Sequence, residues 1–114
     1  MRSEYSDLLP LSPATLHVLL ALAGEDRHGY GIMLEVARQS AGRYKVGPGT
    51  LYDNLKKLLK LGLVEECAPD SLDAVTRRIY RLSEEGRAVL GAETERLSEV
   101  LREARRCLRL NEGR

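Results

Sequence analysis

The clearest pattern in this 114-residue chain is the segment PGTLYDNLKKLLKLG, residues 48–62. Proline suits the first position of a helix and glycine suits the position just past its end, so the segment predicts one complete helix. Leu51, Leu55 and Leu58 form an apolar stripe along it. At about 100° per residue, the residues opposite the stripe are Gly49, Asp53, Lys56 and Lys60, with Thr50, Tyr52 and Lys57 beside them. Such a helix can pack through its leucines and present its lysines to a partner.

Two more helices are predicted before this segment. Ser12-Pro13 combines a hydroxyl N-cap with a proline at the first helical position, and Gly24 ends the helix that follows. A second helix should run from about Tyr30 to Ala41. The apolar residues expected to face inward on it are Ile32, Met33, Val36 and Ala37.

After residue 62 the pattern changes to that of a β-hairpin. Residues 63–67 and 77–82 are short segments with strand-like composition, and Tyr80 and Leu82 fall on one side of the second strand. The turn-rich stretch APDSLDA, residues 68–74, joins them. Because a lone hairpin is only marginally stable in water, this one should lean on the helices.

A final helix is predicted from its cap, Ser83, to about Leu110. Apolar residues recur along it at alternating steps of four and three, which is the spacing of a heptad seam. Leaving its leucines in water would forfeit roughly 1.5–3 kcal/mol each, so we expect the helix to pair with the same helix of a second chain. The alternative is a helix folded back on its own domain. The residues expected in the dimer interface are Leu90, Leu97, Leu101, Ala104 and Leu108.

The order helix, helix, helix, strand, turn, strand is that of a winged helix-turn-helix. The expected fold class is therefore mainly α with a small two-stranded β-wing, followed by a C-terminal dimerisation helix. We expect residues 1–86 to form the winged helix-turn-helix domain and residues 87–114 to form the dimerisation helix, the two making one compact unit.

Four motifs in order make the sequence resemble the PadR-like family of transcriptional regulators over about residues 12–90. The motifs are HGYGI at 28–32, GTLY at 49–52, LLKLGLVE at 58–65 and RRIYRLSEEGR at 77–87. The resemblance implies a homodimeric DNA-binding repressor whose affinity for its operator is relieved by a small-molecule effector.

The predicted helix Pro48–Leu61 has the exposed chemistry of a recognition helix for double-stranded DNA, whose major groove admits one α-helix. Its amino end can offer backbone N–H groups and a hydroxyl to phosphate. Its lysines suit phosphate or guanine, and its aspartate could accept from a cytosine amino group or cap locally. The alternative for the lysines is a solvated helix face. The expected DNA-binding residues here are Gly49, Thr50, Tyr52, Asp53, Lys56, Lys57 and Lys60.

The family resemblance also implies basic wing residues beside the DNA backbone or minor groove, which in this chain are Arg77 and Arg78. Side chains alternate along a strand, so one of the pair should face DNA while the other can pair with Glu65 or Glu66 across the hairpin. The wing tip departs from the family pattern because two aspartates lie within residues 68–74, where phosphates would repel them.

Charge is unevenly distributed along the chain, although the net charge is only +1. Residues 27–60 carry seven basic and two acidic side chains. A basic middle indicates an anionic partner, although a solvated helix face would give the same count. Two recognition helices related by a dimer axis would fit a pseudo-palindromic operator with half-sites about 34 Å apart.

Several function classes are disfavoured by what the sequence lacks. No apolar run approaches the roughly 20 residues that span a bilayer, and the amino terminus does not have the charge pattern of a secretory signal, so we expect a soluble, cytoplasmic protein without a membrane partner. Cys67 and Cys107 lack metal-like spacing, and His17 and His28 lack partners for a metal or catalytic site. We therefore expect no enzyme activity, no metal and no cofactor.

Three questions stay open at the level of sequence. The effector site is unknown: Tyr5, Tyr30 and Tyr44 are candidate pocket residues, although ordinary packing is the favoured role. Cys107 could crosslink a dimer, but free cysteines more commonly pack as small apolar residues. The functional alternative is a protein–protein adaptor that uses a winged-helix scaffold without DNA, and salt dependence of DNA binding separates the two.

Overall fold

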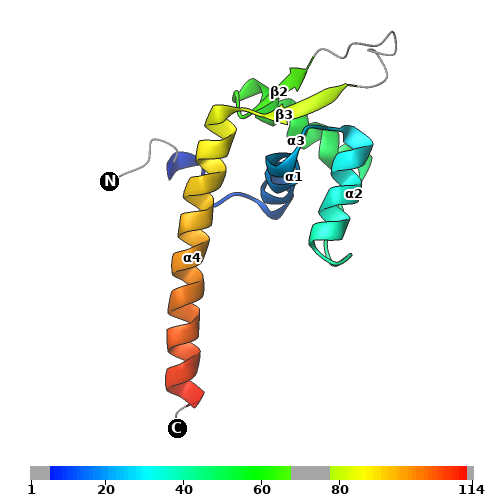
Figure 1. The fold of residues 1–114 in the computed structure, drawn as a ribbon. Helices are drawn as coiled ribbons and strands as arrows, with labels where there is room; N and C mark the ends of the chain where they lie inside the picture. The colour runs from blue at the N-terminus through cyan, green and yellow to red at the C-terminus, as the bar shows by residue number, and fades with distance from the viewer. Residues whose placement is uncertain (1–5, 68–77, 113–114) are drawn as a thin grey trace.

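The computed structural model describes residues 6–67 and 78–112 and confirms a mainly helical winged-helix fold (Figure 1). A short 3₁₀ turn, η1, precedes three helices that are followed by the hairpin and a long final helix. In chain order the elements are η1 (Ser6–Leu8), α1 (Pro13–Gly24), β1 (Arg27–His28), α2 (Gly29–Gln39), α3 (Pro48–Lys60), β2 (Val64–Cys67), β3 (Ile79–Leu82) and α4 (Glu84–Glu112).

The hydrophobic core lies between the three short helices, the sheet and the first turns of α4. Tyr80 and Leu82 are buried and Arg81 is exposed, so the predicted alternation along this strand is confirmed. On α2, Ile32 and Val36 are fully buried, while the other two residues expected inside are only partly buried. The three leucines of α3, predicted from their spacing, are buried with at most 1% of their surface exposed.

Both hydroxyl caps predicted from the sequence are present. Ser12 Oγ accepts a hydrogen bond from the Thr15 backbone N–H at 3.2 Å, and Ser83 Oγ accepts from Gly86 N–H at 2.9 Å. The second helix begins slightly earlier than expected because His28 caps it, with Nδ1 accepting from Gly31 N–H at 3.1 Å. An imidazole nitrogen thus satisfies a helix-end donor that usually pairs with a hydroxyl or carboxylate.

The sheet has three strands in the order β1-β3-β2, all antiparallel, where the sequence predicted only two. The added strand is β1, in which Arg27 pairs with Tyr80 and His28 with Ile79. Two residues are too short to show an alternating pattern, so sequence periodicity could not identify this strand. Because β1 directly precedes α2 and pairs with β3, the start of α2 is connected to the wing.

The final helix, α4, is continuous from Glu84 to Glu112 and extends well past the rest of the described chain (Figure 1). Its first turns pack on the core through Val89 and Leu90. Leu90 was expected in the dimer interface, but only 7% of it is exposed because it fills a place in the chain's own core, so it offers almost no surface to a second chain. Within the described residues, no helix is long and apolar enough to cross a membrane.

A buried carboxylate marks the point where α4 leaves the core. Glu93 is 1% exposed, accepts a hydrogen bond from the Leu11 backbone N–H at 3.1 Å, and receives two more from the Arg96 guanidinium at 2.7 and 3.0 Å. These hydrogen bonds, with that of Arg96 foremost, lower the pKa of Glu93 against the opposing effect of burial. Glu93 therefore ties the segment before α1 to the middle of α4.

Candidate nucleic-acid interface

The outer face of α3 is a continuous exposed surface on which all the DNA-binding residues predicted for this helix lie. Leu51, Leu55 and Leu58 turn the opposite face into the core and thereby fix the rotation of the helix. The exposed residues are Gly49, Thr50, Tyr52, Asp53, Lys56, Lys57 and Lys60. A short amphipathic helix anchored along one side in this way can present the other side to a groove.

The amino end of α3 leaves backbone donors free. The cap is Gly47, which has no side-chain hydrogen bond to offer, and Pro48 has no N–H group. The first hydrogen bond of the helix runs from Leu51 N–H to the Gly47 carbonyl at 2.9 Å, so the N–H groups of Gly49 and Thr50 have no partner within the helix. Together with the helix dipole, these two donors suit an anionic oxygen.

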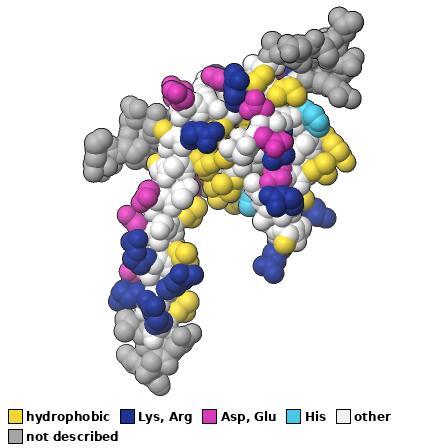
Figure 2. All heavy atoms as spheres, viewed as in Figure 1, with side chains coloured by type: hydrophobic (Ala, Val, Ile, Leu, Met, Phe, Trp, Pro, Cys, Tyr) yellow, Lys and Arg dark blue, Asp and Glu magenta, His cyan; other side chains and the backbone are white. Residues whose placement is uncertain are grey.

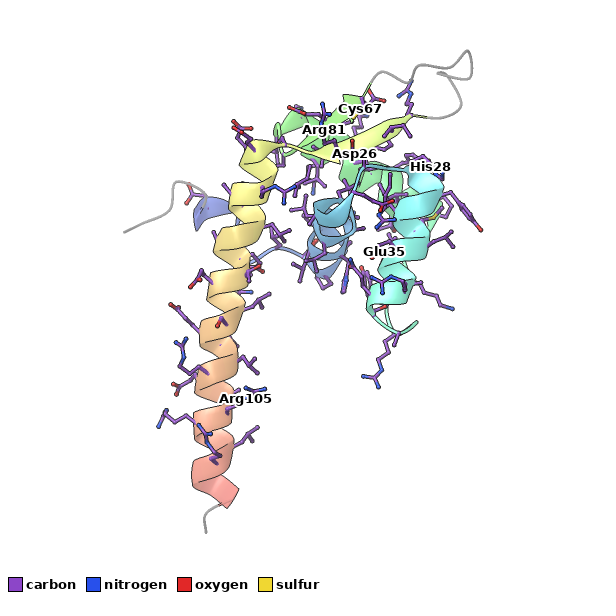
Figure 3. The ribbon with its side chains drawn as sticks, in the orientation of Figure 1. Asp26, His28, Glu35, Cys67, Arg81 and Arg105 are labelled. Carbon is purple, nitrogen blue, oxygen red and sulfur yellow. The ribbon has the colours of Figure 1, made fainter. Side chains whose placement is uncertain are left out.

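The basic residues of the middle of the chain fall into two groups. Arg27 and Arg38 both pair with Glu35, at 3.6 and 2.6 Å, and Glu35 is labelled on α2 in Figure 3. The Arg38 hydrogen bond foremost, with Arg27 assisting, lowers the pKa of Glu35 to about 2. By contrast, no carboxylate of the described residues lies within 4.0 Å of the α3 lysines. Arg43 and Lys45, exposed in the segment before α3, also have no such partner among the described residues. The cations left for an outside partner therefore lie on α3 and in the segment that leads into it, which a count of charges could not show.

Tyr52 is half-exposed, at 49%, and the end of its ring lies against the first residue of α2. A Cβ built on Gly29, the first residue of α2, would lie 2.1 Å from the Tyr52 hydroxyl oxygen and 2.8 Å from the carbon that bears it. A side chain at this position would therefore displace the Tyr52 ring from its contact with α2. The motifs at 28–32 and 49–52 meet at this contact, which fixes the exposed face of α3 relative to α2.

Asn54 is a structural residue of the site that the sequence analysis missed. Its side-chain oxygen accepts a hydrogen bond from the Thr15 hydroxyl at 2.7 Å, and its amide nitrogen donates to the Thr50 carbonyl at 2.9 Å. This side chain connects the start of α1 with the first turns of α3. A polar residue between two leucines of the buried stripe was the available signal.

Of the two wing arginines, Arg77 lies outside the described residues, as does the wing tip with its two aspartates. Arg78 is exposed, and its guanidinium lies 3.3 Å from a Glu66 carboxylate oxygen, which is one of the two pairings expected across the hairpin. A second cross-strand pair joins Arg81 to Glu65, also at 3.3 Å. The described arginines of the wing are thus already paired within the chain.

The projecting half of α4 exposes an apolar face. Leu97, Leu101 and Leu108 are 37%, 50% and 58% exposed, and Ala104 lies exposed between them. Val100, at 51%, widens this face and was not among the predicted interface residues because it falls outside a strict heptad. Figure 2 shows hydrophobic side chains along the side of the projecting helix that is turned toward the rest of the molecule.

The remaining candidate residues occupy ordinary structural positions. Tyr44 stacks on His17 with ring centres 4.7 Å apart, and Tyr30 is 62% exposed on α2. Tyr5 lies outside the described residues. Cys67 is half-buried and Cys107 is exposed; burial raises the pKa of the first thiol and the neighbouring Glu103 carboxylate that of the second. Across the described ranges, no three His, Cys, Asp or Glu side chains are grouped as metal ligands would be.

Comparisons with known proteins agree on one family. The model of the "Transcriptional regulator PadR-like family" matches residues 18–92. Transcriptional regulator Rv3488 of Mycobacterium tuberculosis is 36% identical over 88 residues, which are 77% of this chain and 78% of that protein.

Solved structures share the fold. A transcriptional regulator from Clostridium thermocellum superposes with a TM-score of 0.71 at 20% identity, covering 82% of this chain and 87% of that one. A PadR family transcription regulator from hypervirulent Clostridium difficile gives 0.68 at 21% identity, covering 85% and 99%. RosR of H. salinarum gives 0.65 at 27% identity, covering 94% and 97%.

Proposed function

We propose, since this chain belongs to the PadR-like family of transcriptional regulators, that it represses transcription by binding a pseudo-palindromic operator as a homodimer. The family assignment makes the protein a DNA-binding regulator with a winged-helix fold and not an enzyme. The sign of regulation, the contacts to DNA and the assembly are the parts that we add.

The exposed face of α3 is the surface that we place in the major groove. The free N–H groups of Gly49 and Thr50 would bind a phosphate at one end of the helix, and Lys56, Lys57 and Lys60 would contact phosphates or guanine further along. Tyr52 and Asp53 share this face and would approach the base edges. The unpaired lysines are the observation that carries the proposal, because no carboxylate of the described residues lies within 4.0 Å of them.

Dimerisation is proposed through the apolar face of the projecting half of α4, which consists of Leu97, Val100, Leu101, Ala104 and Leu108. Burying the exposed halves of the four large side chains would contribute about 1 kcal/mol each. The division of the chain into a DNA-binding part and a dimerisation helix belongs to this proposal. A two-fold axis through this face would relate two α3 helices, as adjacent half-sites require.

Relief of repression by a small-molecule effector completes the proposal. Its support is the family resemblance, and no effector site is assigned. At a fixed salt concentration, an effector should raise the dissociation constant of the complex between the protein and its operator. It should leave the mass of the DNA-free protein unchanged.

The test is the salt dependence of binding to a duplex selected from a random pool. With about six phosphate contacts the logarithm of the affinity should fall against the logarithm of salt with a slope near −5. K56A/K57A should weaken binding to all sequences and reduce the slope by about two units. The matched control is R102A/R109A, which removes two exposed cations from the projecting half of α4 and should leave the slope unchanged.

A salt-independent or undetectable interaction with every duplex would contradict the proposal and favour the adaptor alternative. If wild type binds and K56A/K57A binds equally well, α3 is not the element that enters the groove.

A further inference from the structure

The two cross-strand ion pairs of the wing lie on opposite faces of the hairpin. Glu65 is opposite Arg81 and Glu66 is opposite Tyr80 in the β2–β3 register. Because successive side chains of a strand alternate, Glu66 points to the same side of the hairpin as the buried Val64, Tyr80 and Leu82, whereas Glu65 and Arg81 share the other side. Glu66 is itself exposed, and its ion pair brings Arg78 to it. Cys67 falls on the same side as Arg81 by this register, and both are labelled on the hairpin in Figure 3.

The inner pair is connected to the exposed face of α3. Tyr80 is 4% exposed, and burial raises the pKa of its hydroxyl, with the Glu66 carboxylate and the Tyr52 hydroxyl adding to the increase. Tyr80 therefore lies within electrostatic reach of Glu66 on the wing and of Tyr52 on the recognition helix. The carboxylate of Glu66, 39% exposed, stands at the junction of the two wing strands, opposite Tyr80 in the register.

A carboxylate at this junction has a cost for an anionic ligand. Arg78 would bind a phosphate only by leaving Glu66, which would then stand unpaired near the DNA backbone, or by staying paired, in which case its charge is already compensated. Either route lowers the free energy that the Arg78 guanidinium contributes to DNA binding. The outer pair imposes no such choice, because Arg81 and Glu65 face away from α3.

We infer that Glu66 is a negative determinant of DNA affinity, an internal competitor with the DNA phosphates for the Arg78 guanidinium. The inference rests on the proposed function, since it assumes that the α3 face binds DNA and that Arg78 of the wing lies beside the DNA backbone, as the family resemblance implies. The Glu66 carboxylate would thus limit the affinity of the wing for DNA, although the hydrophobic core does not depend on this side chain.

The experiment compares wild type, E66Q and E65Q on one selected duplex over a range of salt concentrations. Each variant removes one negative charge and one ion pair from the same hairpin, so long-range effects of net charge are matched. E66Q should bind about 3- to 10-fold more tightly than E65Q and steepen the salt slope by about one unit relative to it.

The same pair of substitutions is repeated in an R78A background, where the difference between E66Q and E65Q should disappear. Equal affinities of E66Q and E65Q, weaker binding by E66Q, or a difference that persists without Arg78 would each overturn the inference. Thermal unfolding of every variant checks that folding is retained. If wild type binds no duplex at low salt, the proposed function fails and this inference with it; if wild type binds and the variants do not differ, the inference alone fails.

Discussion

Gly86 is the glycine at which an added methyl group would clash with the backbone of another segment. A Cβ there would lie 2.0 Å from the Leu63 carbonyl oxygen, which belongs to the backbone and cannot rotate away. Two hydrogen bonds pull this turn against α4, one from Ser83 N–H to Leu63 O at 3.1 Å and one from Ser83 Oγ to Gly62 O at 2.6 Å. The glycine of the SEEGR motif thus lets the start of α4 close over the end of α3.

We predict that G86A lowers the free energy of unfolding by about 1–3 kcal/mol, because the backbone has to move to admit the new carbon. The matched control is G91A in the same helix, whose added Cβ would have nothing within 4 Å. It should stabilise the protein by up to about 1 kcal/mol through helix propensity. Urea unfolding at one fixed protein concentration measures both. Equal effects of the two substitutions would show that the contact with Leu63 is unimportant.

The sequence placed both Gly29 and Gly86 within motifs, but it did not show which contact requires a glycine there. Gly86 is required by the backbone carbonyl of Leu63, and Gly29 leaves room for the Tyr52 ring; both neighbours are more than twenty residues away in the chain. A pattern of local spacing contains no information on such approaches. The Ser12 cap was predictable because its partner, Thr15, is local.

Among the elements, α3 was the most predictable, because Pro48 and Gly62 bound it and its leucines recur at helical spacing. Strand β1 was not, since its two residues acquire their conformation only by pairing with β3. The sequence predicted that one wing arginine could pair with Glu65 or Glu66 across the hairpin, and the fold pairs Arg78 with Glu66. The second pair, Arg81 with Glu65, was not predicted. Composition gives the number of charges, and only the register decides which of them are compensated.

The junction between α4 and the segment before α1 gives a prediction for pH. In the native state the pKa of Glu93 lies below its ordinary value of 4.5. Its contribution to stability is therefore complete above about pH 4.5 and is lost as the pH falls through the native pKa. E93Q should lower the free energy of unfolding by about 1–3 kcal/mol at neutral pH, and the difference from wild type should shrink in acid.

Urea unfolding of wild type and E93Q at pH 7 and at several values below 4.5 measures this difference. A control is E99Q, on the exposed half of α4, for which no comparable loss is expected at any pH. A gap between wild type and E93Q that stays constant down to the lowest pH would contradict the assigned ion pair.

For the whole molecule, the main feature is that α4 uses one apolar face twice. Its first turns bury Val89 and Leu90 against the chain's own core, and the same face continues beyond Glu93 with Leu97, Leu101 and their neighbours exposed. The sequence indicated one long seam, but it could not show where the packing within the chain stops. That boundary depends on how far the core reaches along the helix.

We predict that the protein has a mass of twice 12.7 kDa in solution at micromolar concentration and that L101E reduces it to the monomer. A buried carboxylate without a partner would be costly in the paired face. Loss of the second half-site should weaken operator binding by at least about tenfold. The control, R106E, places a carboxylate on the far side of the helix and should remain dimeric. Light scattering measures the masses, and a dimeric L101E would exclude this face as the interface.

The central claim is that two α3 helices, related by a dimer axis, enter neighbouring major grooves of one duplex. Hydroxyl-radical footprinting of the wild-type protein on its selected duplex tests this most directly. We expect two symmetric protected patches whose centres are about 10 base pairs apart. At a protein concentration that just saturates the site with wild type, both patches should be absent in K56A/K57A. A single patch, or protection that survives the loss of both lysines, would contradict it.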